Sequence, residues 1–189
     1  MSQGHEFLAS LGARLAREGM NLITAFGLGV GSHFINGALN EFEREGSRSI
    51  SDRLILRPFP YEIADREKRL ARWKTYREDM ISRAGVAIFV FGNKVDDKGE
   101  IASADGMLEE FKIAHAMGLL IVPVGSTGSV AAKIHEVVSA DLTKYFPETR
   151  GLKAALRDLS RPGRPRETVD RVIHFIDLMA DAKGDALSH

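Results

Sequence analysis

The stretch that decides the fold is residues 22–32, which read Leu-Ile-Thr-Ala-Phe-Gly-Leu-Gly-Val-Gly-Ser. An apolar run ends there at three glycines spaced two apart, and Ser32 is followed by Phe34 and Ile35. This order is typical of a strand, a tight loop and a helix. Glycines let the backbone approach a ligand closely, and a helix start presents N–H groups and a positive dipole end. The stretch therefore predicts a phosphate-binding loop.

Composition narrows the class of protein. The chain has 189 residues, of which 44% are hydrophobic, enough for one globular domain over residues 1–189. Lys+Arg 26 against Asp+Glu 26 gives no net charge, which argues against a nucleic-acid partner. The chain has no Cys, so disulfides and zinc–thiolate sites are excluded. Without a membrane-length apolar run or a signal peptide, we expect a soluble cytoplasmic protein with no membrane partner.

Short apolar strands alternate with amphipathic helices along the chain. This alternation predicts the α/β class, with a Rossmann-like, doubly wound parallel sheet in a single domain. Its core covers about residues 7–138, and a helical extension covers about 143–181. The expected strands are 20–25, 54–56, 86–91 and 119–124, with loops at 46–52 and 92–104. The expected helices are 7–17, 32–45, 65–83, 105–117, 129–138, 152–159 and 167–179.

The loops after residues 25, 91 and 124 all follow strands, so we expect them at the carboxyl edge of the sheet, where ligands bind. The first has the pattern G-x-G-x-G-S, which is not the G-x-G-x-x-G dinucleotide fingerprint, and a plain strand-to-helix turn is the alternative. The candidate ligand-binding residues of the first and third loops are Phe26, Gly27, Leu28, Gly29, Gly31 and Ser32, then Gly125, Thr127 and Gly128.

Charged candidates lie near the same edge. Arg77, late in an amphipathic helix, can meet a phosphate, although a surface pairing with Glu78 or Asp79 is the alternative. Lys94 follows Gly92 and Asn93, where a solvated loop lysine is the alternative. Glu109 and Glu110, after Gly106, point about 100° apart on a helix, so they do not form an acid/base pair. One of them can accept hydrogen bonds from ribose hydroxyls.

The catalytic motifs that we sought are absent from the sequence. It has no H-E-x-x-H spacing, no G-x-S-x-G elbow and no Walker lysine. Trp73 and Tyr76 are expected to be packing residues, because aromatic groups at helical spacing are usually core. We therefore expect no catalytic residue, no metal and no cofactor.

Taken together, these segments resemble the SLOG superfamily, and within it the branch associated with sirtuin and TIR domains (STALD). The resemblance covers about residues 7–138. It rests on the motifs of residues 24–32, 54–60, 76–81, 88–94, 109–111 and 121–128.

The resemblance implies a sensor that is not an enzyme. Such a domain binds a cyclic ADP-ribose isomer made by a TIR-domain enzyme during phage infection. Binding then activates a sirtuin-like NADase, in the same or a partner chain, within a homo-oligomer (a dimer or tetramer). In this chain Arg77, Lys94 and Glu109 match the family's ligand-contacting positions, and residues 27–32 and 125–128 match its phosphate- and ribose-facing loops.

This chain departs from the family pattern in two ways, so we expect either an excised regulatory domain or a stand-alone sensor. The family begins with an additional strand before the first helix, and the sirtuin-like part is not in this sequence. The alternative function is that of a LOG-type nucleoside monophosphate phosphoribohydrolase. Its P-G-G-x-G-T-x-x-E signature is not intact at Gly92, Asn93, Lys94, Gly106 and Glu109. A DNA-binding relative of the DprA type is disfavoured by the neutral charge.

Overall fold

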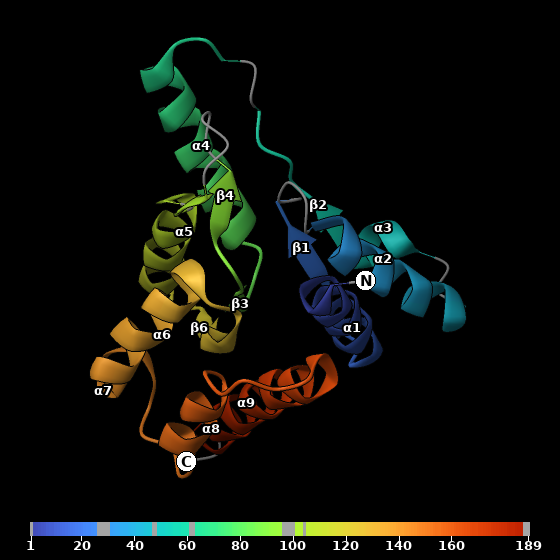
Figure 1. Ribbon diagram of the computed structural model, residues 1–189, viewed down its shortest axis with the longest axis vertical. Coiled ribbons are helices and arrows are strands. Elements are labelled where there is room, and N and C mark those ends of the chain that lie inside the picture. The colour runs from blue at the N-terminus through green and yellow to red at the C-terminus, as the bar shows by residue number, and fades with distance from the viewer. Residues whose placement is uncertain are drawn as a thin grey trace. The chain divides into compact units, whose positions relative to one another are not determined.

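The computed structural model describes residues 2–25, 31–46, 49–60, 63–95, 101–103 and 105–186. The chain divides into two compact units, residues 1–84 and 85–189, whose elements are labelled in Figure 1. The expectation of a single domain stays a prediction.

The first unit combines a helix pair with a short parallel sheet. Strands β1 (Leu22–Thr24) and β2 (Leu54–Leu56) pair in parallel, with Leu22 opposite Leu54. The helices of this unit are α1 (Gln3–Arg17), α2 (Gly31–Arg44), α3 (Ile50–Arg53) and α4 (Arg66–Ile81).

Glycines allow α1 and α2 to cross in backbone contact. A Cβ at Gly12 would lie 2.1 Å from the carbonyl oxygen of Phe34, and one at Gly37 would lie 1.9 Å from that of Ala9. No side chain fits at either distance, so both positions require glycine. The apolar faces of the two helices are buried at Leu11 and Phe42 among others.

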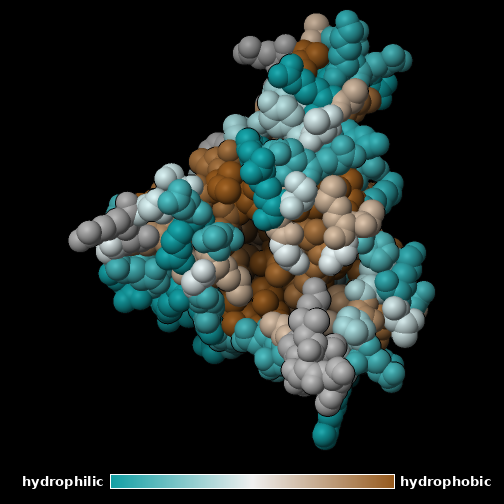
Figure 2. Space-filling view, turned by 180° about the vertical axis from the view of Figure 1, so that it is seen from behind, coloured by the Kyte–Doolittle hydropathy of each residue, from teal (hydrophilic) through white to brown (hydrophobic). Residues whose placement is uncertain are grey.

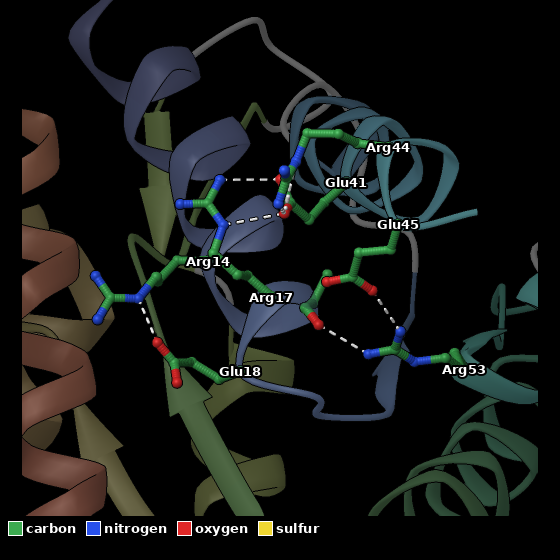
Figure 3. Close-up of polar contacts among 8 residues, drawn as sticks. Arg14, Arg17, Glu18, Glu41, Arg44, Glu45 and Arg53 are labelled. Atoms are coloured by element: carbon green, nitrogen blue, oxygen red, sulfur yellow. Dashed lines mark hydrogen bonds and ion pairs between the residues drawn. The ribbon is translucent and has the colours of Figure 1, made fainter. Parts of the chain in front are cut away.

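A charge network fixes the other end of this helix pair. Glu41 is only 5% exposed, and its carboxylate accepts hydrogen bonds from the guanidinium groups of Arg17, at 3.0 Å, and Arg44. Figure 3 shows both arginines reaching this one carboxylate, with Arg53 bonded to Glu45 beside them. The hydrogen bonds from Arg17 and Arg44 lower the pKa of Glu41 from 4.5 to about 2.

The second unit is built around a pair of parallel strands. β3 (Val86–Phe89) pairs with β6 (Leu120–Pro123), with Val86 opposite Leu120. All four residues of β6 are buried, and because side chains alternate along a strand, both of its faces are covered. The helices that contact β6 are α5 (Asp105–Ala116), α6 (Ser129–Ala140) and α9 (Pro165–Ala186). The short helices are η1 (Gly125–Thr127), α7 (Leu142–Tyr145) and α8 (Leu152–Asp158).

Several expected boundaries were wrong. Residues 92–104, expected as a loop, contain the antiparallel strands β4 (Asn93–Val95) and β5 (Ile101–Ser103). Within the expected loop 46–52, α3 begins at Ile50, where the Ser49 hydroxyl bonds the Asp52 carboxylate. The last helix continues to Ala186 instead of ending at residue 179.

The described residues therefore form a mixed α/β structure with short parallel sheets, which is compatible with a Rossmann-like fold. The strands of the described residues form three separate sheets of two strands each. They do not show one continuous doubly wound sheet.

Candidate functional site

The glycine-rich loop falls largely outside the described residues. Phe26, Gly27, Leu28 and Gly29 lie there, and nothing is said of their structure. Gly31 and Ser32 are described as the first two residues of α2. Ser32 therefore lies in the first turn of α2.

Arg77 lies on the most solvent-exposed of the long helices of the first unit. Of the residues of α4, all described, only Ile81 is buried, and the upper projection in Figure 2 is mostly hydrophilic with a few hydrophobic side chains. The Arg77 guanidinium carbon lies 4.9 Å from the Phe59 ring centroid and 5.9 Å from that of Trp73. These distances are those of cation–π contacts. Two aromatic rings therefore flank this candidate phosphate-binding group.

The two acidic neighbours of Arg77 on α4 have other cationic partners. Asp79 pairs with Arg83 at 2.8 Å and with Arg57 at 3.2 Å, while Glu78 lies 3.9 Å from the ammonium group of Lys74. The hydrogen bond from Arg83, followed by the charges of Arg57 and Arg83, lowers the pKa of Asp79. Because Arg57 follows β2, this pair also ties α4 to the end of that strand.

In the second unit, the turn after β3 is packed against two helix starts. Gly92 has a φ of +97°, and a Cβ there would lie 2.6 Å from Val130 Cβ and 2.8 Å from Met107 Sδ. Val130 is in the first turn of α6 and Met107 in the first turn of α5. The structure thus brings the Gly92 turn together with the starts of these two helices.

The turn after β6 is hydrogen-bonded to the turn after β3. The backbone N–H of Phe91 donates to the hydroxyl of Thr127 at 2.8 Å, and that hydroxyl donates to the carbonyl of Val124 at 2.7 Å. The N–H of Ala131, in α6, donates to the carbonyl of Phe91 at 2.9 Å. Two of the three expected ligand loops are therefore adjacent in the second unit.

The N–H groups of that turn serve the fold. Ser126 donates to the carbonyl of Leu159, Thr127 to that of Val124, and Gly128 to that of Gly125. Gly128 has a φ of +78°, which favours glycine and lets the chain enter α6. Any N–H donor for an anion at this turn must therefore come from other residues.

The remaining candidates are partly described. Glu109 is exposed on α5 and pairs with Lys112 at 2.7 Å, while Gly106 is in the first turn of the same helix. Asn93 is exposed at the start of β4. Lys94 follows it in the same strand, but its side chain lies outside the described residues. The ligand-binding roles of these residues stay predictions.

A cavity of about 510 Å³ in the second unit is lined by none of these candidates. Its walls come from His135, Ser139, Leu142, Lys153, Ala154, Leu156 and Arg157.

The two rings that surround Arg77 were not predicted from the sequence to be part of the site. Trp73, expected to be a packing residue, packs edge to face against Phe59 and is half-exposed, and its Nε1–H donates to the carbonyl of Pro60 at 2.8 Å. The spacing Arg69, Trp73, Arg77 is a signal that could have revealed this face, since residues four apart are neighbours on a helix.

No helix within the described ranges has the length and apolarity needed to cross a membrane. The described side chains include no group of three or more His, Cys, Asp or Glu placed to hold a metal ion.

Comparison with known proteins places the chain in context. A sequence model of the Sir2- and TIR-associating SLOG family (STALD) matches residues 1–179. NAD(+) hydrolase ThsA of Bacillus cereus (strain MSX-D12) is 36% identical over 178 residues, covering 93% of this chain and 36% of the relative. The protein of the same name from Acinetobacter baumannii (strain 532279) is 37% identical over 148 residues, covering 76% of this chain and 31% of the relative. The protein of that name from Enterococcus faecium is 32% identical over 177 residues, covering 93% of this chain and 36% of the relative.

The chain therefore spans about a third of the length of the curated relatives that it matches.

Proposed function

The chain belongs to the Sir2- and TIR-associating SLOG family, and from that premise we propose that it is the regulatory sensor of an antiphage defence system. Its signal is a cyclic ADP-ribose isomer made by a TIR-domain enzyme. Binding of this signal controls a sirtuin-like effector that depletes NAD. The sensor acts as a cytoplasmic homo-oligomer and carries no catalytic residue of its own.

The observation that carries the proposal is the gathering of the Gly92 turn with the starts of α5 and α6. Helix starts favour anions, and Glu109 on α5 supplies an acceptor for ribose hydroxyls. Arg77 and Lys94 supply the cations that a diphosphate needs. In this proposal the parallel strands belong to one doubly wound sheet, whose carboxyl edge presents the loops to the ligand.

The relatives are named for an enzymatic activity. Each is called an NAD(+) hydrolase, but this chain matches only about a third of its length. We assign the hydrolase activity to the part of those proteins that this chain does not match. The present chain then regulates NAD hydrolysis without performing it.

Calorimetry of the chain with cyclic ADP-ribose isomers, ADP-ribose, NAD and AMP tests the proposal. We expect tight binding of one cyclic isomer and its recovery unchanged by chromatography. Light scattering with and without that isomer tests self-association. Release of adenine from AMP would instead establish the LOG-type hydrolase, and absence of binding to every cyclic isomer would refute the sensor.

Arg77→Ala provides the first variant for this assay. If its guanidinium meets a phosphate, the variant should bind the cyclic isomer about 1.5–3 kcal/mol more weakly. A dissociation constant equal to that of the unchanged protein would remove Arg77 from the site.

A further inference from the structure

We propose that Phe59 and Trp73 are positioning residues that hold the Arg77 guanidinium ready for an anionic ligand. The inference rests on the proposed function, because it concerns how that site is kept in its binding geometry. It assigns a role to the segment Arg57-Pro58-Phe59-Pro60, which the ligand contacts do not explain.

The geometry supports a clamp made of two rings. The Arg77 guanidinium lies 4.9 Å from the Phe59 centroid and 5.9 Å from the Trp73 centroid, and the two rings meet edge to face with centroids 6.0 Å apart. Each of these three side chains is half-exposed. The cation is therefore stacked on aromatic faces, and the residue that carries it is not buried.

The clamp is itself anchored to the strand end. The indole N–H of Trp73 donates to the carbonyl of Pro60 at 2.8 Å, and Asp79 pairs with Arg57 at 3.2 Å. Proline has a fixed φ, so Pro58 and Pro60 stiffen the segment that carries Phe59. One face of α4 is thus held against the chain that follows β2.

Holding an arginine in advance matters for binding. A free arginine side chain loses much rotamer freedom when it pairs with a phosphate, and prior ordering removes part of that cost. Loss of one ring should therefore weaken ligand binding by roughly threefold to tenfold, although neither ring needs to contact the ligand.

A double-mutant cycle with the intact chain tests this role. The probe is whichever cyclic ADP-ribose isomer the unchanged protein binds, and calorimetry gives the affinities of Phe59→Leu, Arg77→Ala and the double variant. We expect Phe59→Leu to weaken binding in the unchanged background and to have no further effect once Arg77 is absent. An equal loss in both backgrounds would indicate general damage to the fold and overturn the proposal.

The matched control is Tyr145→Leu. It removes another half-exposed ring that lies under a cation, 5.5 Å from the Lys144 ammonium, but in the second unit. Its affinity should equal that of the unchanged protein. If Phe59→Leu fails to fold by circular dichroism, Trp73→Leu on the exposed helix α4 removes the other ring and gives the same cycle.

Trp73 also provides a direct readout, because it is the only tryptophan of the chain. Ligand addition should change its fluorescence, and the change should vanish in Arg77→Ala even at saturating ligand. A fluorescence change of the same size in Arg77→Ala would refute the clamp. So would an affinity that falls in Arg77→Ala but in neither ring variant, and both results would leave the proposed function intact. A protein that binds no cyclic isomer would refute the proposed function as well.

Discussion

The backbone N–H of Phe91 donates to the hydroxyl of Thr127 across 2.8 Å, so the end of the β3 segment is tied to the turn after β6. The same hydroxyl donates to Val124. A single side chain thus holds two loops of the candidate site in place. This contact gives Thr127 a structural role that does not depend on any ligand.

Replacement of Thr127 by valine tests that role. The variant keeps the shape of the side chain but leaves the half-buried N–H of Phe91 without its acceptor, so we expect a loss of about 1–3 kcal/mol in the free energy of unfolding. Thr127→Ser retains the hydroxyl and should lose less than half as much. Urea unfolding followed by circular dichroism measures both. Equal stabilities for the two variants would show that the hydroxyl does not hold the loops.

Gly92 gives a second prediction, on a residue that was selected as a ligand contact. Gly92→Ala places a Cβ within 2.8 Å of both Val130 and Met107 at a φ of +97°, so unfolding should become easier by about 2–4 kcal/mol. Gly118→Ala is the control, because its φ is +73° but nothing lies within 4 Å of the added carbon. Gly118→Ala should lower the free energy of unfolding by only about 1 kcal/mol. Similar losses would mean that packing contributes nothing at Gly92.

How far the sequence predicts this structure depends on the element. Residues 54–56 were predicted with the observed bounds, because two prolines and a polar segment delimit a fully apolar triplet. The hairpin of β4 and β5 was missed, since each of its strands contributes only three residues and a single large apolar side chain, Val95 or Ile101. Such segments form strands through pairing with each other, which a local pattern does not reveal.

The candidate site shows a similar division. Gly92 and Gly128, both expected as ligand contacts, have positive φ values of +97° and +78°. The atoms nearest to a Cβ added at Gly92 belong to Val130 and Met107, so packing alone already requires a glycine there. A glycine required by packing and one required by a ligand look alike in a single sequence. The contact of Arg77 with Phe59 was not predicted because it joins two separate segments, whereas its contact with Trp73 follows from a spacing of four residues on α4.

Glu41 leads to a prediction on the pH dependence of stability. Its pKa is about 2 in the folded protein and 4.5 as the reference value, because Arg17 and then Arg44 bond the charged form. A lowered folded pKa stabilises the fold above the unfolded value and loses that effect as the pH falls through the folded value. Glu41→Gln should therefore lower the melting temperature at pH 7, and the difference from the unchanged protein should shrink between pH 4.5 and about 2.

Glu43→Gln, at an exposed position of the same helix, is the control for Glu41. Glu43→Gln should leave the melting temperature nearly unchanged at pH 7 and at acidic pH, because exposed charges contribute little to stability. A difference between Glu41→Gln and the unchanged protein that stays constant with pH would mean that side-chain shape, and not the charge, stabilises this helix pair.

The last prediction separates the two adjacent carboxylates of α5. Glu109 is exposed and paired with Lys112 over 2.7 Å, and it matches the family's ligand-contacting position. Glu109→Gln removes the charge but keeps the size, so ligand binding should weaken by about 1–3 kcal/mol, more than for Glu110→Gln. Lys112→Met is informative beside them, because it breaks the exposed pair alone and should change the stability by less than about 1 kcal/mol. Calorimetry with the cyclic isomer compares Glu109→Gln with Glu110→Gln, and urea unfolding measures Lys112→Met. A larger loss of affinity for Glu110→Gln would assign the ribose contact to Glu110.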